Sequence, residues 1–315
     1  MKIQTYHTLL ILFATLTLAT NCTTNYKYKI GVSQCVGGRW RDKANIEMIS
    51  AQHLYDTDVK VIIKDADNSN ERQCQQIDSL VDEGVDLLVV SPNDYQALNG
   101  SLQRARNKNI PIVFYDRTTA LNDYTAYIGG DNVEAGRKMA EYAAMLCRDS
   151  VKTEGRQPIV LEMTGPLEIS PAAQRHKGFS EAISRYSDID YHHVPSKWSY
   201  DDCKRIMQEW LKEGKTVDVV FCHSDLAAIG AYEAAKKFHK ERDIHFIGID
   251  GLPGEGIDAV QKGQLSASYI YPTHGEEVIA LALRILEGKT FERVNNMKSF
   301  VVTPQNVADI SLSSN

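Results

Sequence analysis

Short runs of aliphatic and β-branched residues alternate with longer segments of helical periodicity from residue 29 onward. Such near-continuous apolar runs are typical of strands that a parallel sheet buries on both faces. The predicted strands are Lys29–Ser33, Val59–Lys64, Asp86–Ser91, Pro111–Asp116, Pro158–Glu162, Val217–His223 and Ile244–Asp250, with a short strand near Ala126–Gly129.

Helices are predicted between these strands, because apolar residues recur there on one helical face. The expected N-caps are Asn70, Asn132 and one of Asp201 and Asp202. Strand–helix–strand units force parallel pairing with right-handed crossovers. The fold class is therefore α/β, with two doubly wound parallel-sheet lobes and a hinge near Gly129 and Gly130.

Residues 1–25 are set apart as an N-terminal targeting segment. Lys2, the apolar run from Leu9 to Leu18 and the small residue Ala19 predict a secretory signal peptide. A short membrane anchor stays open, although the run is shorter than the ~20 residues of a membrane span. Lipoprotein processing at Cys22 also stays open, with Asn21 where a small residue is expected. Each alternative predicts a periplasmic chain, secreted across or anchored to the inner membrane.

Composition excludes several classes of function. The chain has 315 residues, 43% of them hydrophobic, with a net charge of -6 and a pI of about 5.9. An acidic chain without a basic block is a poor nucleic-acid binder. None of the six cysteines forms a CxxC pair, so a zinc site is not expected. No other metal and no cofactor are expected either. One disulfide stays open, with Cys35 and Cys74 as the favoured pair.

The polar residues that follow the strands are the candidate site, because ligands of open α/β sheets bind beyond the carboxyl ends of the strands. Carboxylates accept hydrogen bonds from vicinal hydroxyls, an arginine fork donates two, and an indole covers the C–H face of a sugar ring. These chemistries together predict a small polyol as ligand. The candidates are Arg39, Trp40, Asp116, Arg117, Arg175, Trp198, Ser224, Asp225 and Asp250.

Ordinary structural roles for these residues stay open at this point. Asp225 could cap a helix, Asp116 and Arg117 could form a surface ion pair, and both tryptophans could be packing residues. An enzyme is not expected, because the chain has neither a GxSxG nor an HExxH motif. Asp116 and Asp250 could flank a glycosidic bond, so a sugar hydrolase is kept as a remote alternative.

Six motifs in a fixed order resemble those of the type I periplasmic binding proteins, and the ribose-binding branch is nearest in pattern. The resemblance covers residues 29–304 and implies two lobes, joined by three crossing segments, that close on a sugar. It places the lobes at 26–129 plus 272–298 and at 130–271 plus 299–315. The motifs are DEGVDLLVVSPND (82–94), NIPIVFYDR (109–117), YIGGDNVEAGRKMAEY (127–142), QRHKGF (174–179), VVFCHSDLAAIGAYEA (219–234) and FIGIDGLP (246–253).

The resemblance also implies roles for single residues. In the first lobe, Arg39 and Trp40 match aromatic stacking positions, and Asp116 and Arg117 match the hydroxyl-binding pair. In the second lobe, Arg175 matches the family's arginine, Trp198 matches the second aromatic wall, and Asp250 matches a carboxylate position. Tyr271 matches a hinge position where ribose binders carry an amide. Gly37, Arg39 and Ser224 depart from the ribose pattern, beside a retained Asp225. The expected ligand is therefore a furanose-form ketohexose or pentose such as fructose.

Two biological roles fit the resemblance. A signal peptide stands where repressors of this fold class carry a DNA-binding helix-turn-helix, so the repressor role is set aside. The favoured role is the sensor domain of a hybrid two-component histidine kinase; the alternative is a solute-binding protein that feeds an ABC sugar transporter. The expected partners are a monosaccharide and either the kinase portion or an ABC permease, with no nucleic acid, and a homodimer stays open.

Overall fold

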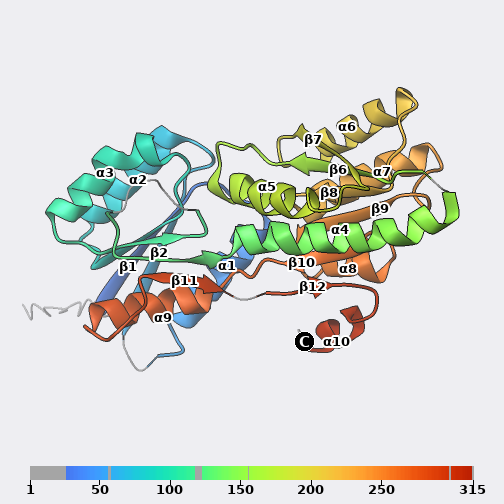
Figure 1. Cartoon of the computed structure of the whole chain (residues 1–315). Coiled ribbons are helices and arrows are strands. Elements are labelled where there is room, and N and C mark those ends of the chain that lie inside the picture. Colours follow the sequence, from blue (N-terminus) through green and yellow to red (C-terminus); the bar gives the residue numbers. More distant parts are fainter. Residues whose placement is uncertain (1–25, 56–57, 118–122, 155, 298, 314–315) are drawn as a thin grey trace, which may run out of the picture.

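The computed structural model describes residues 26–55, 58–117, 123–154, 156–297 and 299–313. The predicted signal peptide and Cys22 lie outside these residues. Within them the chain forms two six-stranded sheets that lie next to each other, each with helices on both faces (Figure 1). The predicted α/β class with two doubly wound lobes is confirmed.

The first sheet has the strand order β11-β5-β4-β3-β1-β2, and all its pairs are parallel. Its apolar strands are buried because helices α1 and α9 cover one face and α2 and α3 cover the other. The strands are β1 (Tyr28–Gln34), β2 (Val59–Asp65), β3 (Leu87–Val90), β4 (Ile112–Tyr115), β5 (Ala126–Gly130) and β11 (Val294–Met297). The helices are α1 (Arg39–Ala51), α2 (Asn70–Asp82), α3 (Tyr95–Asn107) and α9 (Gly275–Leu286).

The second sheet has the order β12-β10-β9-β8-β6-β7, with only β12 antiparallel among its described pairs. Helices α4 and α5 cover one face, and α6, α7, α8 and α10 cover the other. The strands are β6 (Ile159–Thr164), β7 (Asp190–Pro195), β8 (Val219–Cys222), β9 (His245–Asp250), β10 (Ala267–Ile270) and β12 (Val301–Val302). The helices are α4 (Asn132–Glu154), α5 (Ser170–Ile183), α6 (Tyr200–Lys212), α7 (Asp225–Lys237), α8 (Gly256–Gln261) and α10 (Val307–Ser313).

The chain crosses between the sheets after β5, after β10 and after β11. The exact limits of the lobes stay a prediction. No helix within the described residues has the length and apolarity that crossing a membrane requires.

Two local predictions need correction. Each predicted N-cap lies one or more residues too late, because a second capping residue precedes it: Ser69, Asp131 and Ser199 accept the first-turn amide hydrogen bonds. The Cys35–Cys74 disulfide is wrong, since both residues are free cysteines. Cys35 contacts Ser91 beside β1, whereas the Cys74 thiol points from α2 toward the Ala97 carbonyl of α3.

Candidate functional site

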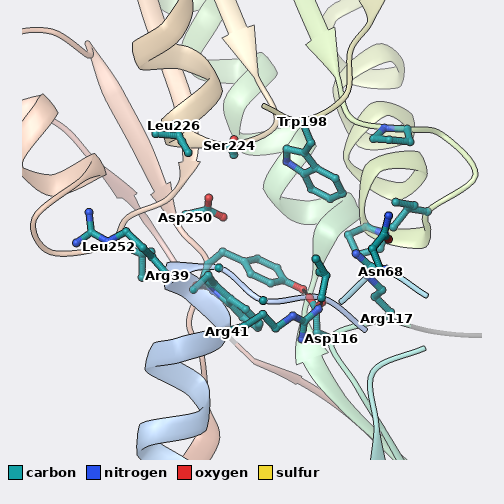
Figure 2. A pocket seen from close by; sticks show the side chains of 18 of the residues that line it. Arg39, Arg41, Asn68, Asp116, Arg117, Trp198, Ser224, Leu226, Asp250 and Leu252 are labelled. Carbon is teal, nitrogen blue, oxygen red and sulfur yellow. Dashed lines mark hydrogen bonds and ion pairs between the residues drawn. The ribbon is translucent and has the colours of Figure 1, made fainter. Parts of the chain in front are cut away.

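A cavity of about 520 Å³ lies between the lobes, at the carboxyl ends of strands from both sheets. In Figure 2, Trp198, Ser224 and Leu226 form one wall and face Arg41 and Asp116 on the other. Nine of the ten predicted site residues line it: Arg39, Trp40, Asp116, Arg117, Arg175, Trp198, Ser224, Asp250 and Tyr271. The structure therefore brings together residues that are far apart in the sequence.

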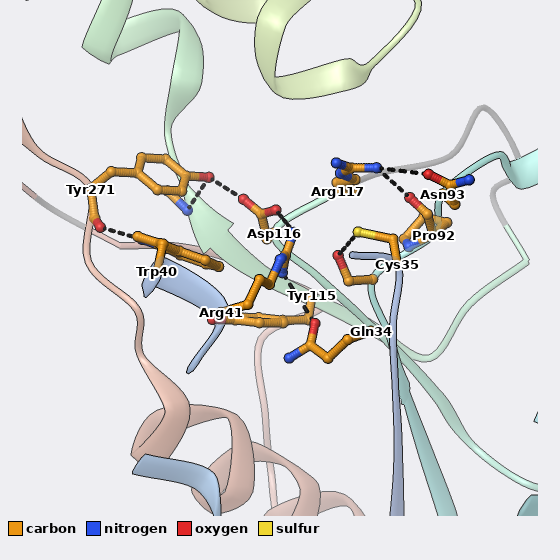
Figure 3. A network of polar contacts seen from close by, with 12 residues as sticks. Gln34, Cys35, Trp40, Arg41, Pro92, Asn93, Tyr115, Asp116, Arg117 and Tyr271 are labelled. Carbon is orange, nitrogen blue, oxygen red and sulfur yellow. Dashed lines mark hydrogen bonds and ion pairs between the residues drawn. The ribbon is translucent and has the colours of Figure 1, made fainter. Parts of the chain in front are cut away.

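The first-lobe wall is built on Asp116, which follows β4 in a left-handed conformation with φ 61. One carboxylate oxygen forms an ion pair with Arg41, and the other accepts a hydrogen bond from the Tyr271 hydroxyl at 3.0 Å (Figure 3). Both Asp116 and Arg117 are more than nine-tenths buried, and Asp116 pairs with Arg41 rather than with its neighbour. These two residues are thus not a surface ion pair.

Arg117 lies beside this carboxylate, and its hydrogen bonds to the described residues are long. Its Nη1 donates to the Pro92 carbonyl and to Asn93 Oδ1, each at 3.5 Å, the upper limit of a hydrogen bond. Burial lowers the pKa of the Arg117 guanidinium. A buried cation with such long contacts has donor capacity left for a ligand.

The second-lobe wall is built on Arg175 of α5. Its Nε donates to Asn132 Oδ1 at 2.9 Å and its Nη1 donates to the His223 carbonyl at 2.5 Å. The guanidinium carbon lies 4.6 Å from the Tyr271 ring centre and 5.3 Å from that of Trp198. The planar group is therefore fixed between two rings, which leaves its Nη2 edge for recognition.

Close packing of α4 on α5 fixes the backbone that carries Arg175. A Cβ atom at Gly136 would lie 2.0 Å from the Arg175 carbonyl oxygen, and one at Gly178 would lie 2.0 Å from the Val133 oxygen. Only glycine permits this approach at both positions. The two helices therefore hold Arg175 and Asn132 at a fixed separation.

A buried pair beneath the second wall supports both Arg175 and Trp198. Glu162 Oε1 lies 2.8 Å from His223 Nε2, while the Gly165 amide donates to His223 Nδ1 at 3.2 Å. Burial lowers the pKa of His223, so its imidazole is neutral with the proton on Nε2. The His223 carbonyl accepts from both Arg175 and the Trp198 indole N–H, so this pair orients two lining residues.

Asp250 ends β9 and reaches the cavity from the second lobe with φ 135. Burial raises the pKa of its carboxyl group well above the ordinary value; the Arg175 charge opposes this shift, and the charges of Asp225 and Glu255 add to it. The cavity therefore favours the protonated form of Asp250 more than water does. A neutral carboxyl group donates one hydrogen bond as well as accepting others.

Asp225 requires a correction, because it does not line the cavity. It is fully buried behind the wall, where its Oδ2 accepts from the Gly251 amide at 2.6 Å and from the Ser268 hydroxyl at 2.7 Å. The cap of α7 is Ser224, which accepts from the Ala227 amide. Asp225 therefore ties α7 to the loop after β9 rather than facing a ligand.

The burial of Asp225 predicts that the stability of the fold decreases as the pH rises. Burial raises the pKa of Asp225 from 3.8 to about 7. Between pH 4 and pH 7 the folded state keeps the Asp225 proton that the unfolded state has released. The contribution of Asp225 to the free energy of unfolding is therefore fully present below pH 4 and is lost as the pH rises through 7. Thermal melts at pH 5 and pH 8 should therefore show a smaller fall in the free energy of unfolding for Asp225→Asn than for the wild type. The expected difference between the two falls is about 1 kcal/mol or more. Parallel pH profiles of the two proteins would contradict this account.

The sequence pattern did not indicate several further lining residues. Arg41 lies in the first turn of α1 beside two predicted residues, where an arginine ordinarily points to solvent. Burial alone would lower its guanidinium pKa, but the Asp116 charge and Cys35 raise it. The further additions with polar or large apolar side chains include Asn68, Lys197, Leu226, Leu252 and Glu255. No group of metal-ligating side chains occurs in the part of the chain that the structure describes.

Arg39 and Trp40 differ from their expected role as open stacking surfaces. Arg39 crosses to the second lobe, where its Nη1 and Nη2 donate to the carbonyls of Gly254 and Pro253 at 3.2 and 3.3 Å. Trp40 is stacked on Tyr115 and donates its indole N–H to the Tyr271 carbonyl at 2.8 Å. Trp40 thus packs at the hinge as well as lining the cavity.

Comparison with known proteins identifies the family to which this architecture belongs. A family model described as periplasmic binding protein domain matches residues 30–290. The ribose import binding protein of Salmonella typhimurium is 26% identical over 231 residues, which cover 73% of this chain and 75% of that protein. The corresponding protein of Bacillus subtilis is 28% identical over 239 residues, 75% of this chain and 74% of that protein. These relatives are binding proteins rather than enzymes.

Two solved structures are also similar. The fructose-binding periplasmic domain of a hybrid two-component system superposes with a TM-score of 0.84 at 36% identity, covering 91% of this chain and 94% of that one. The arabinose-binding component of an ABC transporter from Shewanella sp. ANA-3 has a TM-score of 0.81 at 23% identity, covering 90% and 95%. The second likeness concerns the fold alone.

Proposed function

The chain belongs to the periplasmic binding protein family, and on that premise we propose that it binds a monosaccharide between its lobes. A furanose-form ketohexose or pentose is favoured, with fructose first. The proposed role is the periplasmic sensor domain of a sugar-responsive two-component system. The observation that carries the proposal is the cavity itself: a carboxylate held at both oxygens, a guanidinium held between rings and the indole of Trp198 meet across it.

These side chains suit a polyhydroxy ring. Asp116 accepts from ligand hydroxyls, while Arg117 and Arg175 donate to hydroxyl and ring oxygens from opposite lobes. Asp250 in its neutral form donates or accepts, and Trp198 covers the apolar face of the ring. The 36% identity to a fructose-binding sensor domain supports fructose over ribose.

Binding is proposed to shift the lobes toward a closed form. Asp116 and Arg117 belong to the first lobe, and Arg175 and Asp250 belong to the second, so only a closed form brings both sets onto one sugar. A ligand that contacts both walls stabilises that form by its differential affinity. Arg39 already joins the two lobes through the carbonyls of Gly254 and Pro253.

A transporter-feeding solute-binding protein is the second candidate. It is favoured by the curated relatives of 26–28% identity, which are import binding proteins. The two candidates share the ligand site and differ in the partner: a kinase portion on the same chain or a separate permease. Reading the gene on both sides of these 315 residues distinguishes them.

Calorimetry against fructose, ribose, arabinose, galactose and glucose tests the ligand, and small-angle scattering on the same samples tests closure. We expect fructose to bind tightest and the radius of gyration to fall at saturation. Heat from none of the sugars would refute the proposed ligand class. An unchanged radius of gyration at saturation would refute closure while leaving binding in place.

A further inference from the structure

We propose that Tyr271 is a positioning residue, which orients Asp116 for the ligand and couples it to Arg175 of the opposite lobe through a directed chain of hydrogen bonds. The inference rests on the proposed sugar site and deepens it, because it concerns how the two walls of that site act together. Tyr271 lies where the chain crosses from β10 to α9.

The direction of each hydrogen bond follows from its partners. Arg175 Nε can only donate, so the Asn132 atom at 2.9 Å is the amide oxygen. The Asn132 amide nitrogen then faces the Tyr271 hydroxyl at 3.0 Å and donates to it, and the Gly130 amide donates to the same oxygen at 3.3 Å. Both neighbours are donors, so the single phenolic proton must point to Asp116 Oδ1 at 3.0 Å (Figure 3).

The chain of donors therefore runs Arg175 to Asn132 to Tyr271 to Asp116, from one wall of the cavity to the other. All four residues are more than nine-tenths buried, so water does not compete readily for these bonds. Burial raises the pKa of the Tyr271 phenol well above its ordinary value, which keeps the proton in place. A shift of Arg175 on ligand binding is thus felt at Asp116 through three polar contacts.

The ring of Tyr271 is held independently of its hydroxyl. It lies 5.7 Å from the Trp40 ring and 4.6 Å from the Arg175 guanidinium carbon. A Cβ atom at Gly130 would approach the ring to 2.2 Å, so glycine leaves the room that the ring occupies. Phenylalanine at 271 should therefore keep the packing and remove only the relay.

The function of the hydroxyl is to keep Asp116 from turning. With Tyr271 on Oδ1 and Arg41 on Oδ2, the carboxylate plane is fixed and its remaining lone pairs are available to the sugar. Without the phenol, both oxygens are free to turn toward the Arg41 fork, which favours bidentate pairing. The ligand would then compete with Arg41 for the same oxygens.

Calorimetry of Tyr271→Phe with fructose tests the relay, and Tyr115→Phe is the matched control. The Tyr115 hydroxyl is also buried and donates to the Thr273 carbonyl of the same crossing segment, but not to Asp116. We expect Tyr271→Phe to weaken binding about tenfold or more with an unchanged fold, because a hydrogen bond to a charged group is lost. Tyr115→Phe should stay within about threefold of the wild type.

An Asp116→Asn background separates positioning from direct contact with the sugar. Asparagine has one acceptor oxygen where aspartate has two, and Arg41 and Tyr271 bind different oxygens of Asp116. If the amide oxygen faces the charged Arg41, the NH2 group faces the phenol, which then has no acceptor at this position. Tyr271→Phe should then cause almost no further loss. An equal loss in both backgrounds, or affinity within twofold of the wild type for Tyr271→Phe alone, would overturn the relay. A wild type that binds no sugar would instead overturn the proposed function.

Discussion

Arg175→Ala is expected to lower the sugar affinity about a hundredfold or more while the protein remains folded. The free edge of the guanidinium offers two charge-assisted hydrogen bonds to the ligand, worth roughly 1.5–3 kcal/mol each, and ~1.4 kcal/mol corresponds to a factor of ten. The substitution also removes the donor to Asn132 Oδ1 and one of the two donors to the His223 carbonyl. Calorimetry with fructose measures the affinity, and a thermal melt by circular dichroism checks the fold.

Two variants control this experiment. Arg175→Lys keeps the charge but loses the planar fork, so it should recover little of the affinity. Arg185→Ala removes an exposed arginine just beyond the end of the same helix and should bind like the wild type. Retained affinity in Arg175→Ala would show that the second lobe recognises the ligand through other groups.

The strands of both sheets could be predicted because they are buried on both faces and read as continuous apolar runs. The strands β7, β10, β11 and β12 were not among those predicted. β7, β11 and β12 lie at sheet edges and are only partly buried, and β10 is a four-residue run that includes Ala267 and Ser268. Helix starts were displaced for a different reason. Two polar residues in succession can each cap a helix, and the backbone direction that chooses between them is set by packing.

The site was predictable to the extent that it follows the ends of strands. Topology alone brings Asp116 to the carboxyl edge of the first sheet and Ser224 and Asp250 to that of the second, whatever their side chains do. The side chains decide the rest: Asp225 can turn inward because Gly248 and Gly256, which lack a Cβ, leave the space that its carboxylate occupies. No pattern in the sequence reports that proximity.

The ion-pair partner of Asp116 could not be predicted from the sequence either. Its sequence neighbour Arg117 is the obvious partner, yet Arg41 forms the ion pair from the start of α1. Adjacent residues at a strand end point in different directions, whereas the first turn of a helix packed on the sheet reaches over the strand end. A charged side chain in the first turn of a helix, such as Arg41, can thus be buried and form part of a site between the lobes.

Arg41→Met is expected to lower the free energy of unfolding by about 3 kcal/mol or more, because breaking a buried ion pair leaves one charge uncompensated. Arg41 and Asp116 are each more than nine-tenths buried, and Arg41 also contacts Gln34 and the Trp40 ring. Methionine retains much of the side-chain volume, so loss of packing contributes little. Urea titration of the purified chain measures the change.

Adding Asp116→Asn to Arg41→Met should recover most of this stability without recovering sugar binding. Asparagine tolerates the left-handed conformation at 116, accepts from Tyr271 through its amide oxygen and carries no charge to bury. If the double variant stays as unstable as Arg41→Met, packing rather than charge explains the single effect. If it binds fructose as the wild type does, the carboxylate is not the ligand acceptor. The expected result, a stable protein with much weaker sugar binding, means that a costly buried pair is retained here for recognition, since neutral side chains would serve the fold equally well.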